Sequence, residues 1–137
     1  MTRFMITLEQ VVELIWHAFE DMFSGEIYVK KVISMKVSDT ALACVPEAKN
    51  QIIGIRPGEK LHEQMIGTED VLYTYQHSEH YKVLPDIHSW GNDPLRINDC
   101  SLVAPDFTYF SDNNADWMSI TSLQTWIEQN RDHIGKI

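Results

Sequence analysis

Apolar side chains recur at helical spacing near the start of the chain. Between residues 7 and 22 they fall three or four positions apart, which places them on one face of an α-helix. Thr7 precedes this stripe with Gln10 three residues later, the pattern of a capping box, and Ser24-Gly25 provides a stop signal. The sequence therefore predicts a helix over residues 7–22. Its apolar positions are Leu8, Val11, Val12, Ile15, Phe19 and Met22.

Residues 26–32 and 51–55 are rich in β-branched or aromatic side chains, which is typical of short strands. A second helix is expected between them, with Ser34 as its N-cap and Pro46 as the residue that ends it. A strand, a helix and a strand in succession predict a β-α-β unit with parallel strands. The apolar positions of this second helix are Val37, Ala41, Leu42 and Val45.

The second half of the chain mixes strands with irregular segments. A helix is expected over residues 60–66, and residues 71–84 predict two strands joined by a hairpin loop. Proline, glycine, Asp and Asn interrupt residues 85–118, which we expect to form an irregular arm and tail. A terminal helix is expected over residues 119–130, with Ser119 as N-cap. Its apolar face contains Ile120, Leu123, Trp126 and Ile127.

The composition matches that of a soluble globular protein, and the helices and strands expected along the chain indicate a mixed α/β (α+β) class. The chain has 137 residues, of which 44% are apolar and 23% charged, so we expect one domain over residues 1–137. Eleven Lys and Arg against 20 Asp and Glu give a net charge of -9, which argues against nucleic acid or an anionic membrane as a partner. Two cysteines form no disulfide framework, and no apolar run could span a bilayer, so a cytoplasmic location is expected.

A Pro-Gly turn at residues 54–60 carries the most specific candidate chemistry. Its glycine spacing is too short for a P-loop and no Ser or Thr follows Lys60, which excludes that class of nucleotide site. Arg56 can bind phosphate oxygens with two N–H groups, and Glu59 can accept from a ribose or orient the arginine. A diphosphate-sugar site and an ordinary charged surface turn are both compatible with this spacing.

Other functional patterns are incomplete. His77, His80 and His88 lie near one another in the sequence but lack the further ligands of a zinc site, so no metal site is predicted and they are expected at the surface. The sequence contains no nucleophile elbow and no glycine-rich dinucleotide turn. Four tryptophans exceed the needs of one small core, which favours a surface covered by another chain or domain. They are Trp16, Trp90, Trp117 and Trp126.

Four segments occur in an order that resembles a known family. They are residues 2–10 (TRFMITLEQ), 25–31 (GEIYVKK), 34–36 (SMK) and 52–63 (IIGIRPGEKLHE). Together they resemble the C-terminal part of UDP-N-acetylglucosamine 4,6-dehydratases of the capsular and O-antigen polysaccharide-biosynthesis family, which are extended short-chain dehydrogenase/reductases. The segment 110–119 is similar to the tail of the branch that also epimerises C5.

The resemblance implies a substrate domain that acts with other parts of an enzyme. In this family a Rossmann domain binds NAD or NADP and supplies a Tyr-x-x-x-Lys motif, which none of the five tyrosines here begins. We therefore expect a small β-α-β substrate domain with terminal helices and a hairpin arm, which lacks the Rossmann domain. It would hold no cofactor, bind a UDP-sugar and not be catalytic alone. The missing Rossmann domain or chain and further copies in a homo-oligomer are the expected partners.

The family's substrate contacts map onto four residues of this sequence. By resemblance, Arg3 contacts the UDP diphosphate, Arg56 contacts the same diphosphate or the uridine, and Glu59 binds the ribose or steadies the arginines. Lys60 and Lys31 are weaker candidates. An interaction module derived from such an enzyme, without catalytic function, is the alternative, and a standalone histidine–metal enzyme is a third hypothesis. The sequence departs from the family pattern at Met5, Lys30, Ile33 and Thr40.

Overall fold

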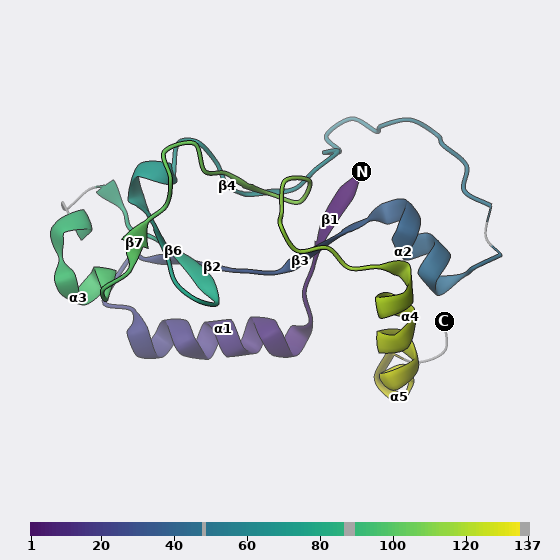
Figure 1. Ribbon diagram of the computed structural model, residues 1–137, viewed down its shortest axis with the longest axis horizontal. Coiled ribbons are helices and arrows are strands. Elements are labelled where there is room, and N and C mark those ends of the chain that lie inside the picture. Colours follow the sequence, from purple (N-terminus) through teal and green to yellow (C-terminus); the bar gives the residue numbers. More distant parts are fainter. Residues whose placement is uncertain (48, 87–89, 135–137) are drawn as a thin grey trace. The chain divides into compact units, whose positions relative to one another are not determined.

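The computed structural model describes residues 1–47, 49–86 and 90–134, which form two compact units. Each unit combines stretches that are separate in the sequence, and each has its own strands and helices (Figure 1). Unit 1 consists of Met1–Met5, Ile33–Glu63 and Phe110–Ile137, and unit 2 consists of Ile6–Val32 and Gln64–Tyr109.

Unit 1 contains a pair of antiparallel strands and a pair of packed helices. Strand β1 (Thr2–Met5) pairs with β3 (Ile33–Lys36), which leads directly into α2 (Val37–Cys44). Helix α4 (Ile120–Gln129) packs against α2, and α5 (Arg131–Ile134) follows it (Figure 1). The core of this unit consists of buried Met35, Ala43 and Leu123, against which Met5, Met118, Ile120 and Ile127 pack.

Unit 2 contains an antiparallel sheet of four strands in the order β2-β6-β5-β7. Helix α1 (Leu8–Asp21) runs beside β2 in Figure 1. The strands are β2 (Ile27–Lys30), β6 (His80–Val83), β5 (Thr74–Gln76) and β7 (Ser101–Leu102). Short helices lie between the strands: η1 (Val71–Tyr73), η3 (Trp90–Asn92) and α3 (Pro94–Ile97). A separate strand pair joins β4 (Gln64–Ile66) to β8 (Tyr109–Phe110).

Three elements follow the sequence pattern closely. Helix α1 begins after Thr7, whose side chain accepts from the Gln10 backbone while the Gln10 side chain accepts from Thr7, so the predicted capping box is confirmed. The hairpin of β5 and β6 is confirmed, and Ser119 caps α4 by accepting from the Ser122 N–H. The mixed α/β class is also confirmed. The single-domain expectation stays a prediction.

Other expectations for the first half were wrong. Residues 51–55 form no regular secondary structure and pair with no strand in the described part of the chain, so the parallel β-α-β unit does not form. The N-terminal residues occupy the edge of β3 instead, and they pair with it in the antiparallel sense. Ser34 lies buried within β3 and does not cap α2, whose N-cap is Lys36. Local spacing could not reveal this pairing, because the two strands are separated by α1 and β2.

The expected helix at residues 60–66 is also absent. Gln64–Ile66 forms β4, because this stretch pairs with β8 far along the chain, and the preceding residues bond to β1. The arm at residues 85–118 is more regular than expected, since it includes α3 and the strand β7 that completes the sheet of unit 2. His88 lies outside the described residues. Among the residues described, no helix is both long and apolar enough to cross a membrane.

Replacing Thr7 with Ala should destabilise unit 2 by about 1 kcal/mol, because it removes the side-chain acceptor of the capping box. Urea unfolding and amide hydrogen exchange of the first turn of α1 would measure the effect. The exposed Thr121→Ala in α4 is the matched control, since no side-chain bond caps a helix there. Equal stability changes in the two variants would contradict the role of the cap.

Candidate functional site

The Pro-Gly turn predicted from the sequence is present in unit 1. The Glu59 N–H donates to the Arg56 carbonyl (3.0 Å), and Gly58 has a φ of +83°, a value that L side chains rarely adopt. Pro57 at the second position and a positive φ at the third are typical of a type II turn. The turn therefore holds Arg56 and Glu59 at its two ends.

Electrostatic contacts within this turn leave the arginine accessible. Glu59 accepts from the backbone N–H of Arg56 (3.2 Å), and its other oxygen lies 3.7 Å from the Arg56 guanidinium. The Arg56 side chain is 78% exposed, so this ion pair contributes little to stability. Lys60, which is also exposed, follows immediately. The turn thus presents the exposed cations of Arg56 and Lys60, with the Glu59 carboxylate between them in the sequence. This arrangement is compatible with an ordinary surface turn and with an anion-binding site.

Arg3 lies beside this turn but has a different environment. Its guanidinium donates to the carbonyls of Lys60 (3.2 Å) and Leu61 (3.3 Å), and to the carbonyl of Thr2 (2.6 Å). Its Nε lies 3.6 Å from a carboxylate oxygen of Glu63. Most of the donors of Arg3 are therefore directed at protein groups.

The structure brings together the four site residues predicted from the sequence. Arg3 contacts the backbone at Lys60, and Arg56 and Glu59 close the preceding turn. Lys31, the other weaker candidate, belongs to unit 2, where its ammonium donates to the carbonyls of His77 and Ser78 (3.2 Å to the latter). Whether Arg3, Arg56, Glu59 and Lys60 bind substrate stays a prediction.

Sequence reasoning missed a buried hydroxyl network behind this site. Thr2 Oγ1 lies 2.8 Å from His62 Nδ1 and 2.7 Å from Ser111 Oγ, and Ser111 Oγ accepts from the Glu63 N–H (2.8 Å). Asp112 lies 3.7 Å from the same His62 nitrogen, so one ring nitrogen faces both the hydroxyl and the carboxylate. A Ser–His–Asp triad uses two different ring nitrogens, and this network is therefore structural.

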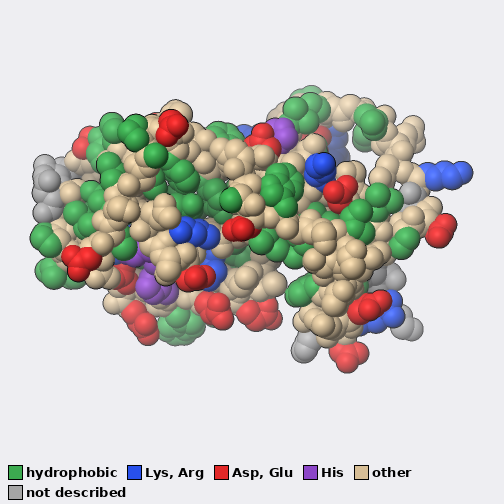
Figure 2. Space-filling model, viewed as in Figure 1, with side chains coloured by type: hydrophobic (Ala, Val, Ile, Leu, Met, Phe, Trp, Pro, Cys, Tyr) green, Lys and Arg blue, Asp and Glu red, His purple; other side chains and the backbone are tan. Residues whose placement is uncertain are grey.

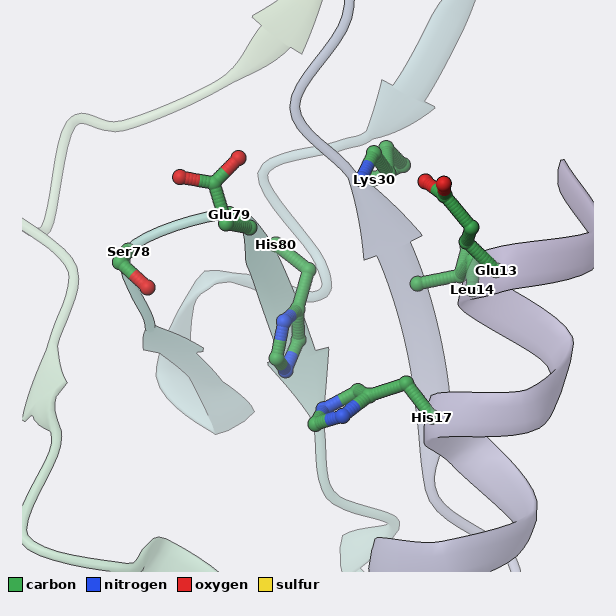
Figure 3. A pocket seen from close by; sticks show the side chains of 7 residues that line it. All are labelled: Glu13, Leu14, His17, Lys30, Ser78, Glu79 and His80. Atoms are coloured by element: carbon green, nitrogen blue, oxygen red, sulfur yellow. The ribbon is translucent and has the colours of Figure 1, made fainter. Parts of the chain in front are cut away.

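A hollow of about 260 Å³ lies in unit 2 between α1, the end of β2 and the hairpin turn that leads into β6. Figure 3 shows the His17 and His80 rings directed toward one another at one side of it, and their centroids are 4.7 Å apart. His80 also stacks on His77 at 4.4 Å. The hollow is lined by Glu13, Leu14, His17, Lys30, Ser78, Glu79 and His80.

His80 is not a surface residue, contrary to the sequence expectation, and His77 is half-buried, whereas His17 is exposed. His80 is only 6% exposed, and the buried Nε2 atoms of His77 and His80 have no hydrogen-bond partner among the residues that the structure describes. Burial, reinforced by the neighbouring cations and imidazoles, lowers the pKa of His80 to about 4 and also lowers that of His77. Within the described residues, no three His, Cys, Asp or Glu side chains are placed to hold a metal ion.

The described residues do not fit a dinucleotide cofactor. A dinucleotide fold needs a glycine-rich turn between a strand and a helix N-terminus. The turn from β1 to α1 contains Ile6 and Thr7, and the first N–H groups of α1 include one that Thr7 itself caps. The positive-φ glycines, Gly25, Gly54 and Gly58, do not lead into the start of a helix. No step of a reaction is therefore assigned to a cofactor held by these residues.

Apolar side chains are unusually exposed in both units. On α1 the outward stripe includes Leu8, Trp16 and Phe19, and in unit 1 Ile52 is 97% exposed. Figure 2 shows hydrophobic side chains interspersed with charged ones over the visible surface. Of the tryptophans, Trp16, Trp117 and Trp126 are exposed, whereas Trp90 stacks on Arg96. Apolar groups at this density are typical of surfaces that other protein covers.

Comparison with known proteins bears on both the family and the fold. The family described as "Polysaccharide biosynthesis protein" matches residues 1–85. The chain is 42% identical over 132 residues to a UDP-N-acetylglucosamine 4,6-dehydratase (inverting) of Campylobacter jejuni subsp. jejuni serotype O:2, covering 90% of this chain and 38% of that protein. A second such protein, from serotype O:23/36, is 38% identical over 134 residues with the same two coverages.

More distant similarities extend this picture. A UDP-glucose 4-epimerase of Rickettsia massiliae is 33% identical over 90 residues, covering 63% of this chain and 26% of the epimerase. The X-ray structure of Pen from Bacillus thuringiensis superposes with a TM-score of 0.76 at 22% identity, over 96% of this chain and 39% of that one. The latter similarity shows a shared fold. The chain thus spans well under half the length of the proteins it matches.

Proposed function

Because the chain belongs to the polysaccharide biosynthesis protein family, we propose that it is the UDP-sugar-binding part of a UDP-N-acetylglucosamine 4,6-dehydratase. The relatives of this name match nine-tenths of the chain and support the assignment. The observation that carries it is the contact between Arg3 and the Lys60 carbonyl. This contact joins the two segments, 2–10 and 52–63, whose sequences resemble those of the dehydratases.

In this proposal Arg56 makes the principal contact with the diphosphate. It is the exposed guanidinium of the site, and a guanidinium forms paired, charge-assisted bonds with phosphate oxygens without titrating at neutral pH. Lys60 adds a second positive charge. Glu59 accepts hydrogen bonds from the ribose hydroxyls or holds Arg56 in place. Arg3 contacts the diphosphate through those N–H groups that do not bond to the carbonyls. Binding is the role assigned to these residues, and none of them performs the chemical step.

We expect Arg56→Ala to weaken UDP binding by about 10- to 100-fold, because a hydrogen bond to a charged group is worth about 1.5–3 kcal/mol. Titration calorimetry of the full chain with UDP and UDP-N-acetylglucosamine measures this effect. Lys49→Ala is the matched control, since it also removes one exposed positive charge from unit 1 but lies outside the segments 2–10 and 52–63. Equal affinities of the two variants would refute the assignment.

The remaining parts of the enzyme would cover the exposed apolar surfaces. We propose that a Rossmann domain, which would carry NAD or NADP, and further copies of the chain are the partners. The apolar stripe of α1 and the exposed Ile52 support this proposal. Light scattering measures the molar mass of the chain alone and after addition of such a domain. A chain that stays monomeric at all concentrations and does not bind the added domain would refute the proposal.

The same exposed surfaces favour a second candidate function. A chain derived from such an enzyme could act as a non-catalytic interaction module, which binds a partner through apolar side chains and no nucleotide. The calorimetric experiment separates the two candidates. Loss of UDP binding in Arg56→Ala with unchanged assembly supports the first, and assembly without any nucleotide effect supports the second.

A further inference from the structure

A chain of short polar contacts ties β1 to the segment that follows the Pro-Gly turn. The Thr2 N–H donates to the Leu61 carbonyl (3.0 Å), and the Thr2 hydroxyl contacts both His62 and Ser111. Ser111, which is fully buried, donates its N–H to the Glu63 carbonyl (2.8 Å) and accepts the Glu63 N–H through its hydroxyl (2.8 Å). The backbone around Glu63 is therefore held from two sides, and buried polar groups that are satisfied in this way rigidify their surroundings.

The Glu63 carboxylate extends from this fixed backbone to β1. One oxygen accepts from the Phe4 N–H (2.9 Å), and the other lies 3.6 Å from Arg3 Nε. Arg3 and Phe4 are neighbours on β1. The Glu63 carboxylate therefore contacts both the backbone of this strand and the guanidinium of Arg3. The carbonyls of Lys60 and Leu61 contact the opposite end of the same guanidinium. Between them, these groups set the direction of the guanidinium plane.

We propose that Glu63 is a positioning residue for anion binding, which acts through Arg3 by holding its guanidinium against the turn that carries Arg56. This inference rests on the proposed function of the site. The carboxylate could have the opposite effect, because a negative charge beside Arg3 also repels an incoming diphosphate. The two effects differ in sign when the charge is removed: loss of positioning weakens binding, and loss of repulsion strengthens it.

Glu63→Gln separates the two effects, because the amide keeps the size and one acceptor oxygen of the side chain but removes its charge. We expect UDP to bind about three- to fivefold more weakly to this variant, the range of one partly exposed ion pair. Glu47→Gln is the matched control, since it removes one negative charge from an exposed position of unit 1 and should leave affinity unchanged. Unchanged or tighter binding by Glu63→Gln overturns the proposal.

A double-mutant cycle tests whether the effect passes through Arg3. In an Arg3→Ala background, Glu63→Gln should cause no further loss of affinity, because the group it positions is gone. An equal loss in both backgrounds would mean that Glu63 acts by maintaining the fold, and thermal unfolding of the same variants would show the corresponding loss of stability.

A measurement without ligand distinguishes failure of this inference from failure of the proposed function. The Arg3 Nε–H signal in an NMR spectrum should exchange slowly with solvent in the wild-type chain and in Glu47→Gln, and faster in Glu63→Gln. If the wild-type chain bound no UDP, the proposed function would fail, and this comparison would still decide whether Glu63 holds Arg3. Equal exchange rates in all three proteins would overturn the positioning role.

Discussion

Asp21→Ala should destabilise unit 2 by about 3–5 kcal/mol, because it leaves a buried ammonium without its carboxylate. The Lys82 side chain is 1% exposed, and its Nζ contacts Asp21 directly and donates to the Arg96 carbonyl (3.1 Å). Burial alone would raise the pKa of Asp21, but hydrogen bonds from Lys82 and Tyr28 and the charge of Lys82 lower it. Asp21 is therefore ionised at neutral pH, and in the part of the chain described it is the carboxylate that forms an ion pair with Lys82.

Urea unfolding, followed by amide hydrogen exchange of β2 and β6, would measure the loss. Glu20→Ala removes the same charge from an exposed position on the same helix and should change stability by less than about 0.5 kcal/mol. Replacing both partners, in Asp21→Ala/Lys82→Met, should recover much of the loss, because no unpaired charge then remains buried. A double variant as unstable as Asp21→Ala would show that the cost comes from lost packing and not from the orphaned ammonium.

Acidification should destabilise unit 2 by about 3 kcal/mol between pH 6.5 and 4 through His80 alone. The unfolded imidazole takes up a proton near pH 6.5, whereas burial lowers the pKa of folded His80 to about 4. Between these values the unfolded state binds more protons, so stability falls as the pH falls. The loss is complete below about pH 4, and His77, whose pKa is also lowered by burial, adds to it.

The groups around His80 explain why its cation is disfavoured. His17 and Tyr28 face its ring from α1 and β2, at centroid distances of 4.7 and 5.5 Å, and His77 stacks on it from the hairpin turn. The positive charge of Lys82 disfavours protonation of His80. The negative charge of Asp21 favours it, but does not outweigh burial and the neighbouring cations. Cys100, 3.1 Å from His77 Nδ1, supplies no compensating charge, because burial raises the pKa of its thiol.

Urea unfolding at pH 7.5, 6.5, 5.5 and 4.5 would test this prediction, with the histidine ring signals followed by NMR. His80→Phe keeps an aromatic ring in the stack but cannot take up a proton, and its stability should depend less steeply on pH over this range. A wild-type protein whose stability is flat between pH 6.5 and 4.5, or a variant with the same pH dependence as the wild type, would contradict the role of His80.

Local patterns predicted those elements that depend mainly on neighbouring residues. The capping box at Thr7 and Gln10, the Ser119 cap of α4 and the hairpin of β5 and β6 all follow from spacing within a few residues, and all are present. The turn at Arg56 and Glu59 is of the same kind, because Pro57 and Gly58 determine its backbone locally.

The sequence by itself determined the family, the caps of α1 and α4 and the residue types of the candidate anion site. Only the tertiary structure decided that β1 pairs with β3, that Ser111 meets Thr2 and Glu63, and that His80 and Lys82 are buried. The physical reason is the range of the interactions. Caps and turns involve atoms a few residues apart, whereas strand pairing, burial and the pKa values that follow from burial depend on groups that folding brings together from distant parts of the chain.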